Sequence, residues 1–185
     1  MFTATIFDTE TPGFKSKGIM QLAAVMVDEE FKPIANFSTL IKPELYDTVE
    51  PGAQAVHGLT MEHCERHGIP LVAALGVLSN FTKVSDVMVC HNWAYDSRVV
   101  GECLAALGRE NFLTRTRNFC TMQALTPICK IPGPRGHKWP KLQEAHKFFF
   151  NEEFESAHDA LADVQATVKL LQKIKADYPQ LLTRV

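Results

Sequence analysis

The sequence predicts an α/β domain in which a mixed β-sheet is covered by helices. Three observations support this fold class: three β-prone runs follow one another near the N-terminus, two further short apolar runs alternate with helical segments, and an apolar stripe of helical period lies near the C-terminus. The 185 residues, 46% hydrophobic and 22% charged, suit a single domain over residues 1–185 and exclude disordered, collagen-like and coiled-coil chains.

The first three strands are predicted at residues 3–7, 19–27 and 34–41, as a meander of antiparallel neighbours. The elements predicted after them are helices at 54–56, 60–66 and 71–81, a buried strand at 87–90, a helix at 93–107, a strand near Phe119, and helices at 122–129, 140–148 and 159–177. Thr60 is the expected N-cap of the helix at 60–66, and Gly108 should cap the C-terminal end of the helix at 93–107.

Basic residues are concentrated in one segment of the chain. The net charge is −2, whereas residues 109–141 contain seven Lys and Arg residues and one acidic residue. Within this segment, the Pro- and Gly-rich run at 131–138 should be an irregular, mobile loop. Its Arg135, His137 and Lys138 are candidates for guiding a polyanion, and a merely solvated loop is the alternative.

The cysteines and the hydropathy pattern indicate the cellular location of the protein. The five cysteines are widely spaced and include no C-x-x-C pair, which argues against a disulfide framework or a zinc site. No run approaches the ~18 apolar residues that a membrane span needs, and no signal peptide follows Met1. We therefore expect a cytoplasmic protein that has no membrane partner.

Asp8 and Glu10 follow the first predicted strand with one residue between them. Side chains two residues apart share one face of a strand, so the two carboxylates should point the same way. Two such charges ~4 Å apart repel each other by about 4 kcal/mol at an effective dielectric constant of 20. A hard divalent cation such as Mg²⁺ or Mn²⁺ removes this repulsion, whereas a turn with solvated side chains is the alternative for such a pair alone.

Further candidate residues follow two later elements. Asp96 lies about one turn into the helix after the strand at 87–90, at the kind of sheet edge where ligands bind in open α/β sheets. His158 and Asp163 would lie ~140° apart on an ideal helix, so His158 is expected on the preceding loop and Asp163 inside the helix. A loop histidine beside a fixed carboxylate suits a general base next to a metal ligand. Alone, Asp96 would more often stabilise its helix N-terminus.

Together these residues resemble the motifs of a known family. The D-x-E motif at 8–10, the N-x-x-Y-D motif at 92–96 and the H-x-x-x-x-D motif at 158–163 are similar, in this order, to the three motifs of the DEDDh (DnaQ-like) 3′-5′ exonucleases. This family includes the proofreading subunit of bacterial DNA polymerase III, ribonuclease T and oligoribonuclease. Segments 41–60 and 139–143 are similar to supporting regions of the family. The resemblance implies a ribonuclease H-like fold, with a five-stranded mixed sheet flanked by helices.

The resemblance also implies two divalent metal ions, Mg²⁺ or Mn²⁺, and a role for each motif residue. Asp8, Glu10, Asp96 and Asp163 would hold the metals, and His158 would be the general base. Two ions suit the in-line attack of water on a phosphodiester. The products would be nucleoside 5′-monophosphates released from a single-stranded 3′ end.

By the same resemblance, a second set of residues would bind the terminal nucleotide. This set comprises Thr9, Thr11, Gly13, Phe14, Val56, His57, Leu59, Asn92 and Tyr95. Gly13 would allow close approach to the sugar, and Phe14 would stack on a base, although packing of Phe14 on the sheet is the alternative. Pro12, Gln21 and Tyr95 depart from the commoner family residues and bear on substrate preference, because none of these positions is a metal ligand in the family.

The resulting hypothesis is a metal-dependent exonuclease that acts on single-stranded 3′ ends, with DNA favoured. An exoribonuclease of the ribonuclease T or oligoribonuclease type is the first alternative. An inactive nucleic-acid-binding module is the second, and the five intact motif positions argue against it. A polymerase and a second copy of the chain are candidate partners.

Overall fold

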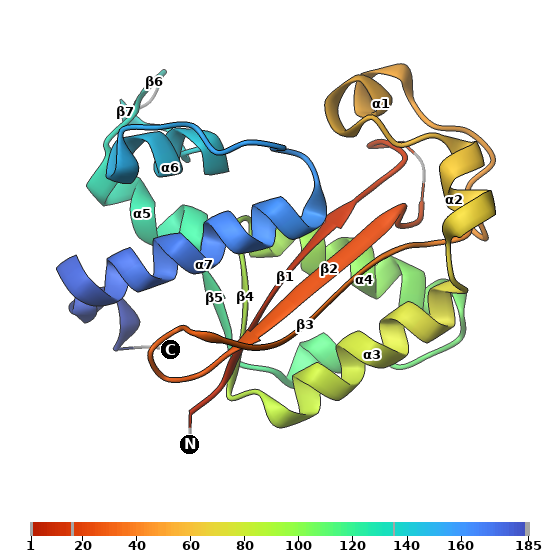
Figure 1. Cartoon of the computed structure of the whole chain (residues 1–185), viewed down its shortest axis with the longest axis horizontal. Coiled ribbons are helices and arrows are strands. Elements are labelled where there is room, and N and C mark those ends of the chain that lie inside the picture. The colour runs from red at the N-terminus through yellow and green to blue at the C-terminus, as the bar shows by residue number, and fades with distance from the viewer. Residues whose placement is uncertain (1, 16, 135, 184–185) are drawn as a thin grey trace.

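The computed structural model describes residues 2–15, 17–134 and 136–183, and a five-stranded mixed sheet lies at its centre (Figure 1). The strands are β1 (Ala4–Glu10), β2 (Gln21–Val27), β3 (Pro33–Leu40), β4 (Val87–Cys90) and β5 (Asn118–Cys120), in the spatial order β3-β2-β1-β4-β5. β1, β2 and β3 pair as antiparallel neighbours, whereas β1, β4 and β5 run parallel. The predicted fold class and the meander are confirmed.

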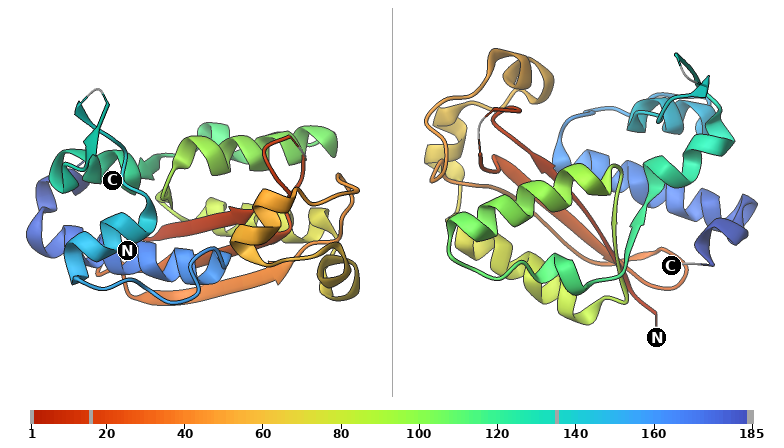
Figure 2. Two further views of the ribbon diagram at one scale, coloured as in Figure 1. Left: turned by 90° about the horizontal axis from the view of Figure 1, so that it is seen from above. Right: turned by 180° about the vertical axis from the view of Figure 1, so that it is seen from behind.

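Helices cover both faces of this sheet. α7 (Ala160–Asp177) lies on one face, and α3 (Leu71–Val84) and α4 (Trp93–Ala106) lie on the other (Figures 1 and 2). Successive β1 side chains alternate between the two layers: Ala4 and Ile6 pack in the cluster that contains α7, and Phe7 packs in the cluster that contains α3 and α4. Asp8 and Glu10 continue the pattern of Ala4 and Ile6, so they extend toward the α7 side of the sheet.

The remaining elements are α1 (Pro51–His57), α2 (Met61–His67), α5 (Thr121–Cys129), α6 (Leu142–Phe150), and short 3₁₀ helices at Phe112–Arg115 and Pro179–Leu182. Thr60 caps α2 as predicted, because its side chain accepts a hydrogen bond from the backbone of His63 at 3.2 Å. Several predicted boundaries were wrong. α1 spans Pro51–His57 rather than 54–56, and α3 continues to Val84 rather than ending at 81. The first strand continues through Asp8 to Glu10, and α6 begins at Leu142, two residues after Pro140.

The run at 131–138 is not irregular, which corrects the sequence prediction. Pro132–Gly133 (β6) pairs with Gly136–His137 (β7) as a short antiparallel hairpin. The backbone of Gly136 has φ of +111°, a conformation that glycine adopts without steric cost, and this allows the tight turn. Arg135 lies outside the described residues.

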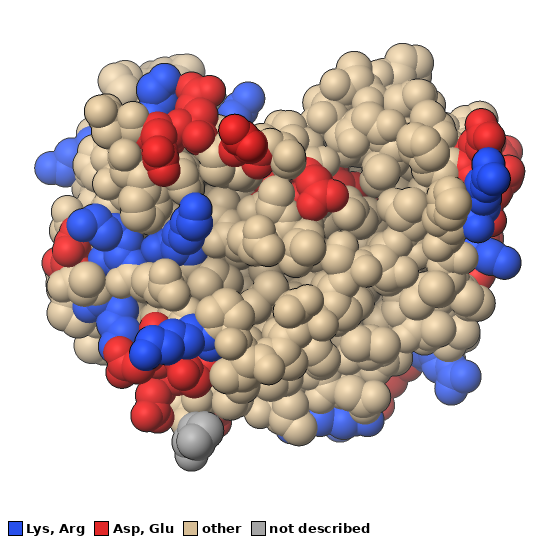
Figure 3. All heavy atoms as spheres, viewed as in Figure 1, with Lys and Arg blue, Asp and Glu red and all other residues tan. Residues whose placement is uncertain are grey.

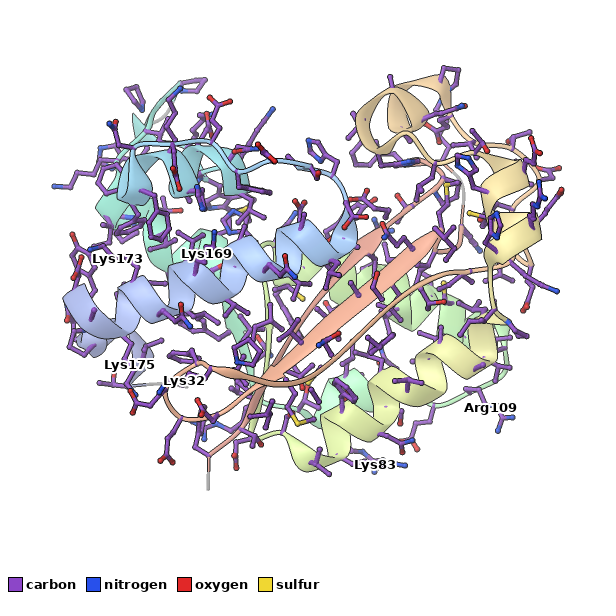
Figure 4. The ribbon with its side chains drawn as sticks, in the orientation of Figure 1. Lys32, Lys83, Arg109, Lys169, Lys173 and Lys175 are labelled. Carbon is purple, nitrogen blue, oxygen red and sulfur yellow. The ribbon has the colours of Figure 1, made fainter. Side chains whose placement is uncertain are left out.

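The basic segment 109–141 does not form one continuous surface. Arg109, labelled in Figure 4, lies on the opposite side of the molecule from the β6–β7 hairpin labelled in Figure 1. Arg115 forms an ion pair with Glu110 at 2.7 Å, and Lys138 forms one with Glu144 at 2.5 Å. Among the described residues of this segment, Arg115 and Lys138 are thus already paired with carboxylates of the protein.

The five cysteines are free thiols, and four of them are buried. Within the described part of the chain, no helix combines the length and the apolar character required to cross a bilayer.

Candidate active site

Four carboxylates and one imidazole meet at the edge of the sheet where β1 and β4 end. Asp8 and Glu10 come from β1, Asp96 from the first turn of α4, and Asp163 from the first turn of α7, with His158 just before that helix. In Figure 3, acidic atoms lie in the hollow between the lobe that contains α1 and the lobe that contains α6. The fold thus brings together all five residues of the three motifs.

The tightest group within this cluster consists of Glu10, His158 and Asp163, in which one ligand atom from each residue lies within 4.8 Å of the others. Burial raises the pKa of Glu10 to about 8, with further contributions from the charges of Asp163 and Asp96. Burial also raises the pKa of Asp163 to about 6. These carboxylates are therefore poorly stabilised as anions by the protein alone.

The other two carboxylates are subject to the same effects. The pKa of Asp8 lies well above its ordinary value because of burial and the charges of Asp96, Asp163 and Glu10. Burial raises the pKa of Asp96 to about 7. Oxygen ligands of this number and charge fit hard divalent cations such as Mg²⁺ and Mn²⁺, which would stabilise all four anions at once.

Thr9 holds the Asp96 carboxylate in place. Its backbone N–H and its hydroxyl both donate to Oδ1 of Asp96, at 3.2 and 2.8 Å, and Asp96 is only 3% exposed. Thr9 was predicted to bind the terminal nucleotide, but both of its donors are used within the protein. Thr9 instead fixes the direction of a candidate metal ligand.

His158 lies on the loop before α7, as its spacing from Asp163 predicted. Its backbone is left-handed, with φ of +69°, and its N–H donates to Oδ1 of Asp163 at 3.2 Å. Asp159 then caps α7 by accepting hydrogen bonds from the next turn at 3.1 Å. Burial and the positive charge of Lys141 lower the pKa of His158, so the imidazole is neutral at pH 7 and able to accept a proton.

Gln21 joins this loop to the sheet, a role that the sequence did not reveal. Its Nε2 donates to Oδ2 of Asp159 at 2.8 Å, and its Oε1 accepts from the backbone N–H of Ala160 at 3.1 Å. Gln21 is buried, and it lies directly opposite Glu10 in the β1–β2 register. Its two partners are more than 130 residues away in the sequence, so no local pattern indicates this contact.

A cavity of about 400 Å³ lies beside Glu10, between the loop after β1 and helix α1. It is lined by Glu10, Thr11, Gly13, Phe14, Glu50, Gly52, Ala53, Val56, His57 and Tyr95. Six of the nine residues predicted to bind the terminal nucleotide therefore line one cavity next to the carboxylate cluster. The other three, Thr9, Leu59 and Asn92, do not line it.

Hydrogen bonds fix one wall of this cavity. The hydroxyls of Thr11 and Tyr95 are 2.8 Å apart, and the carbonyl of Thr11 lies 3.1 Å from Nε2 of His57. The backbone N–H of Leu59 donates to Nδ1 of His57 at 3.0 Å, so Nε2 carries the proton and donates to Thr11. Leu59 thus sets the His57 tautomer, while its side chain packs near Met20.

Glu50 is a second residue that the sequence did not single out. Its N–H donates to the carbonyl of Pro12 and its Oε1 accepts from the N–H of Lys15, both at 2.7 Å, so it fastens both ends of the loop around Gly13. Gly13 has φ of +141°, and the position of a Cβ there is occupied by the Glu50 side chain. Besides allowing close approach of a substrate, glycine is therefore required at position 13 because the Glu50 side chain leaves no room for a Cβ.

Phe14 extends from this loop into solvent. Its side chain is 86% exposed, and its ring meets Tyr95 edge-on with centroids 6.0 Å apart. The alternative in which Phe14 packs on the sheet is therefore wrong, and a face of the ring is available for stacking.

The comparisons with known proteins agree with this geometry. A family model described as exonuclease (RNase_T) matches residues 5–171, whereas no curated protein matches the chain. The zinc-bound complex of E. coli exonuclease I with single-stranded DNA is 22% identical, with a TM-score of 0.83 over 98% of this chain and 42% of that one. Exonuclease I from Methylocaldum szegediense is 21% identical, with a TM-score of 0.80 over 98% and 42%.

The chain thus spans 42% of the length of these two exonuclease I structures. At such identities the likeness establishes a shared fold, which is the five-stranded mixed sheet flanked by helices that the motifs implied.

Proposed function

This chain belongs to the exonuclease family, and from that membership and the geometry of its acidic edge we propose that it removes nucleotides from single-stranded 3′ ends. The products would be nucleoside 5′-monophosphates. One observation supports this proposal above all: the cluster of four carboxylates and His158 is joined, through Glu10, to a cavity of about 400 Å³, suited to one nucleotide. A scissile phosphate at the carboxylates would leave the terminal nucleotide in that cavity.

Asp8, Glu10, Asp96 and Asp163 are the proposed ligands of two divalent ions, Mg²⁺ or Mn²⁺. When bound, such ions would acidify the attacking water and stabilise the negative charge that develops on the leaving 3′-oxygen. Support for this assignment comes from the raised pKa values of all four carboxylic acids, none of which forms an ion pair with a described Lys or Arg residue.

His158 is the proposed general base. Its lowered pKa keeps the ring neutral at pH 7, and its loop position allows it to approach a water molecule without displacing a carboxylate. Gln21 and Asp159 would position it by fixing the start of α7. The terminal base would lie near Val56 and Phe14, whose exposed side chains line the cavity.

DNA is the proposed substrate, and RNA is the alternative. The favoured choice rests on structures of the same fold: E. coli exonuclease I has been solved with dA16 and with dT13 oligonucleotides. A reducing cytoplasm is our proposed location, since the chain holds five unpaired thiols. A polymerase and a second copy of this chain remain candidate partners, and light scattering of the purified protein with and without polymerase distinguishes them.

The decisive test is a nuclease assay on purified protein. Labelled single-stranded DNA, duplex DNA and RNA, each with a free 3′ end, would be incubated with Mg²⁺, Mn²⁺ or EDTA. We expect metal-dependent loss of single nucleotides from the 3′ end of single-stranded DNA, with 5′-monophosphates as products. Degradation that persists in EDTA would contradict the metal assignment. Binding of the oligonucleotides without hydrolysis under any condition would favour the inactive module.

A further inference from the structure

Trp139 is an exposed aromatic residue on a segment of backbone that is otherwise firmly held. Its side chain is 62% exposed, whereas the next residue, Pro140, is buried. A large apolar ring in solvent has no structural explanation in the packing around it, and exposed apolar groups often mark binding surfaces. The described exposed aromatics are few: Phe14, Trp139 and Phe148.

Four contacts anchor the backbone around Trp139. The N–H of Lys138 donates to Ile131, at 2.9 Å, and its ammonium pairs with Glu144 at 2.5 Å. Glu144 also accepts from the N–H of Lys141 at 2.8 Å, and the carbonyl of Pro140 lies 2.9 Å from Nε2 of His91. The indole is therefore presented from a fixed backbone, so little ordering entropy is lost when a flat ligand stacks on it.

These anchors also place the segment beside the active site. His91 directly follows β4, at the edge of the sheet where Asp96 lies. The Lys141 ammonium is near enough to His158 to influence it electrostatically. Trp139 lies in the chain between β7 and α6. Figure 1 shows these two elements on the other side of the end of β1 from α1, whose residues line the nucleotide cavity.

This position matches the path that a substrate must take. If the 3′-terminal nucleotide occupies the cavity beside Glu10 and the scissile phosphate lies at the carboxylates, the strand must leave the cluster on its opposite side. We propose that Trp139 is a stacking platform for a base upstream of the scissile phosphate, with the exposed Lys141 beside the backbone of the strand. The inference rests on the proposed function and extends it by a second base-binding site.

Binding to metal-free protein tests the inference separately from catalysis. The oligonucleotide (dT)₈ would be titrated into wild-type protein in EDTA while tryptophan fluorescence is recorded. Stacking should quench the wild-type emission, and the quenching should largely disappear in Trp139→Phe, which retains only the half-buried Trp93. Trp139→Ala should raise the Kd by about 5- to 150-fold, the equivalent of the ~1–3 kcal/mol measured for base–aromatic stacking. Trp139→Tyr should restore most of the affinity.

Phe148→Ala is the matched control, because Phe148 is a 50% exposed aromatic on α6 of the same lobe. It should bind (dT)₈ as the wild type does. With Mg²⁺, Trp139→Ala should also lose much of the wild-type preference for (dT)₈ over the p-nitrophenyl ester of thymidine 5′-monophosphate.

Two outcomes overturn the inference. If Trp139→Ala binds (dT)₈ as tightly as the wild type, or if Phe148→Ala loses as much affinity, Trp139 is not a stacking site even though the enzyme is active. If wild-type protein neither binds (dT)₈ nor cleaves the ester, both the proposed function and the inference about Trp139 are wrong.

Discussion

The two halves of the acidic cluster are built in different ways. On one side, Asp8 and Glu10 lie on the central strand of the sheet, and Asp96 is held by two hydrogen bonds from Thr9. On the other side, His158 lies in a loop that contains three non-glycine residues with left-handed backbone. Such conformations are unfavourable for side chains that have a Cβ, so the surrounding contacts must maintain them. One half is thus fixed by the fold itself, whereas the other is fixed by a few specific hydrogen bonds.

This difference suits the proposed division of labour. Groups that hold metal ions must keep one geometry, which a central strand provides. A general base must approach a water molecule and then release its proton, which a loop allows more easily. The two halves are also linked, since the backbone of His158 donates to Asp163, a proposed metal ligand.

Substitution of a carboxylate on the central strand should have the largest effect on activity. Asp8→Asn should reduce exonuclease turnover to a trace, because it removes one charge from the proposed metal site at a position that no other group can fill. The fold should remain, and thermal denaturation should show no loss of stability, since repulsion within the cluster decreases. Asp47→Asn, at an exposed loop position, is the control and should keep full activity. Substantial turnover by Asp8→Asn would remove Asp8 from the site.

The loss of His158 should be smaller but still large. His158→Ala should lower kcat by roughly 10²–10⁴, the usual range for a positioned base, while metal affinity measured by calorimetry should stay nearly constant. The wild-type rate should rise with pH through a pKa below 6.5, because burial and Lys141 disfavour the charged imidazole. This rise should be absent in His158→Ala. A wild-type pH profile in His158→Ala would show that another group is the base. The control is His63→Ala, at an exposed position on α2, and its kcat and pH profile should match those of the wild type.

Gln21 connects the halves, and its removal should have a moderate effect. Gln21→Leu keeps the side chain similar in size but deletes both hydrogen bonds to the start of α7. Displacement of His158 should lower kcat by about tenfold, and stability should fall by ~1–3 kcal/mol because buried partners lose their hydrogen bonds. A purely structural role would lower stability and leave kcat and its pH profile unchanged. Gln21→Glu should disturb the loop as well, since it places a carboxylate against Asp159.

The sequence predicted the half of the cluster that contains Asp8, Glu10 and Asp96 better than the half that contains the His158 loop. The alternation along β1 and the position of Asp96 after a buried strand follow from short-range periodicity, so their common edge was predictable. The contacts of Gln21 and Glu50 join segments far apart in the chain, and no local pattern indicates them. The small hairpin of β6 and β7 was missed because Pro and Gly suggested irregular backbone, whereas they formed a tight turn. The run at 131–138 was a candidate for guiding a polyanion because basic residues are concentrated there in the sequence, but the ion pair of Lys138 with Glu144 joins residues that only the fold brings together.

The last prediction concerns stability in the absence of metal rather than turnover, and it distinguishes substitution of Glu10 from substitution of His158. The folded pKa values of Glu10 and Asp163, about 8 and about 6, exceed the ~4 expected for unfolded chains, so the folded protein binds more protons between pH ~4 and 8. Stability in EDTA should therefore fall as the pH rises through this window, and each 1 kcal/mol lost lowers the Tm by about 2–4 °C in a domain of this size.

Millimolar Mg²⁺ should restore the Tm at pH 8 and change little at pH 4, where the carboxylates are protonated. Glu10→Gln should weaken the pH dependence, because it removes a carboxyl group whose pKa in the folded protein is about 8. His158→Ala should retain the pH dependence, since the carboxylates that cause it remain. A Tm in EDTA that stays level from pH 4 to 8 would mean that solvent already stabilises these anions, and the electrostatic reason for a metal at this edge would then be lost.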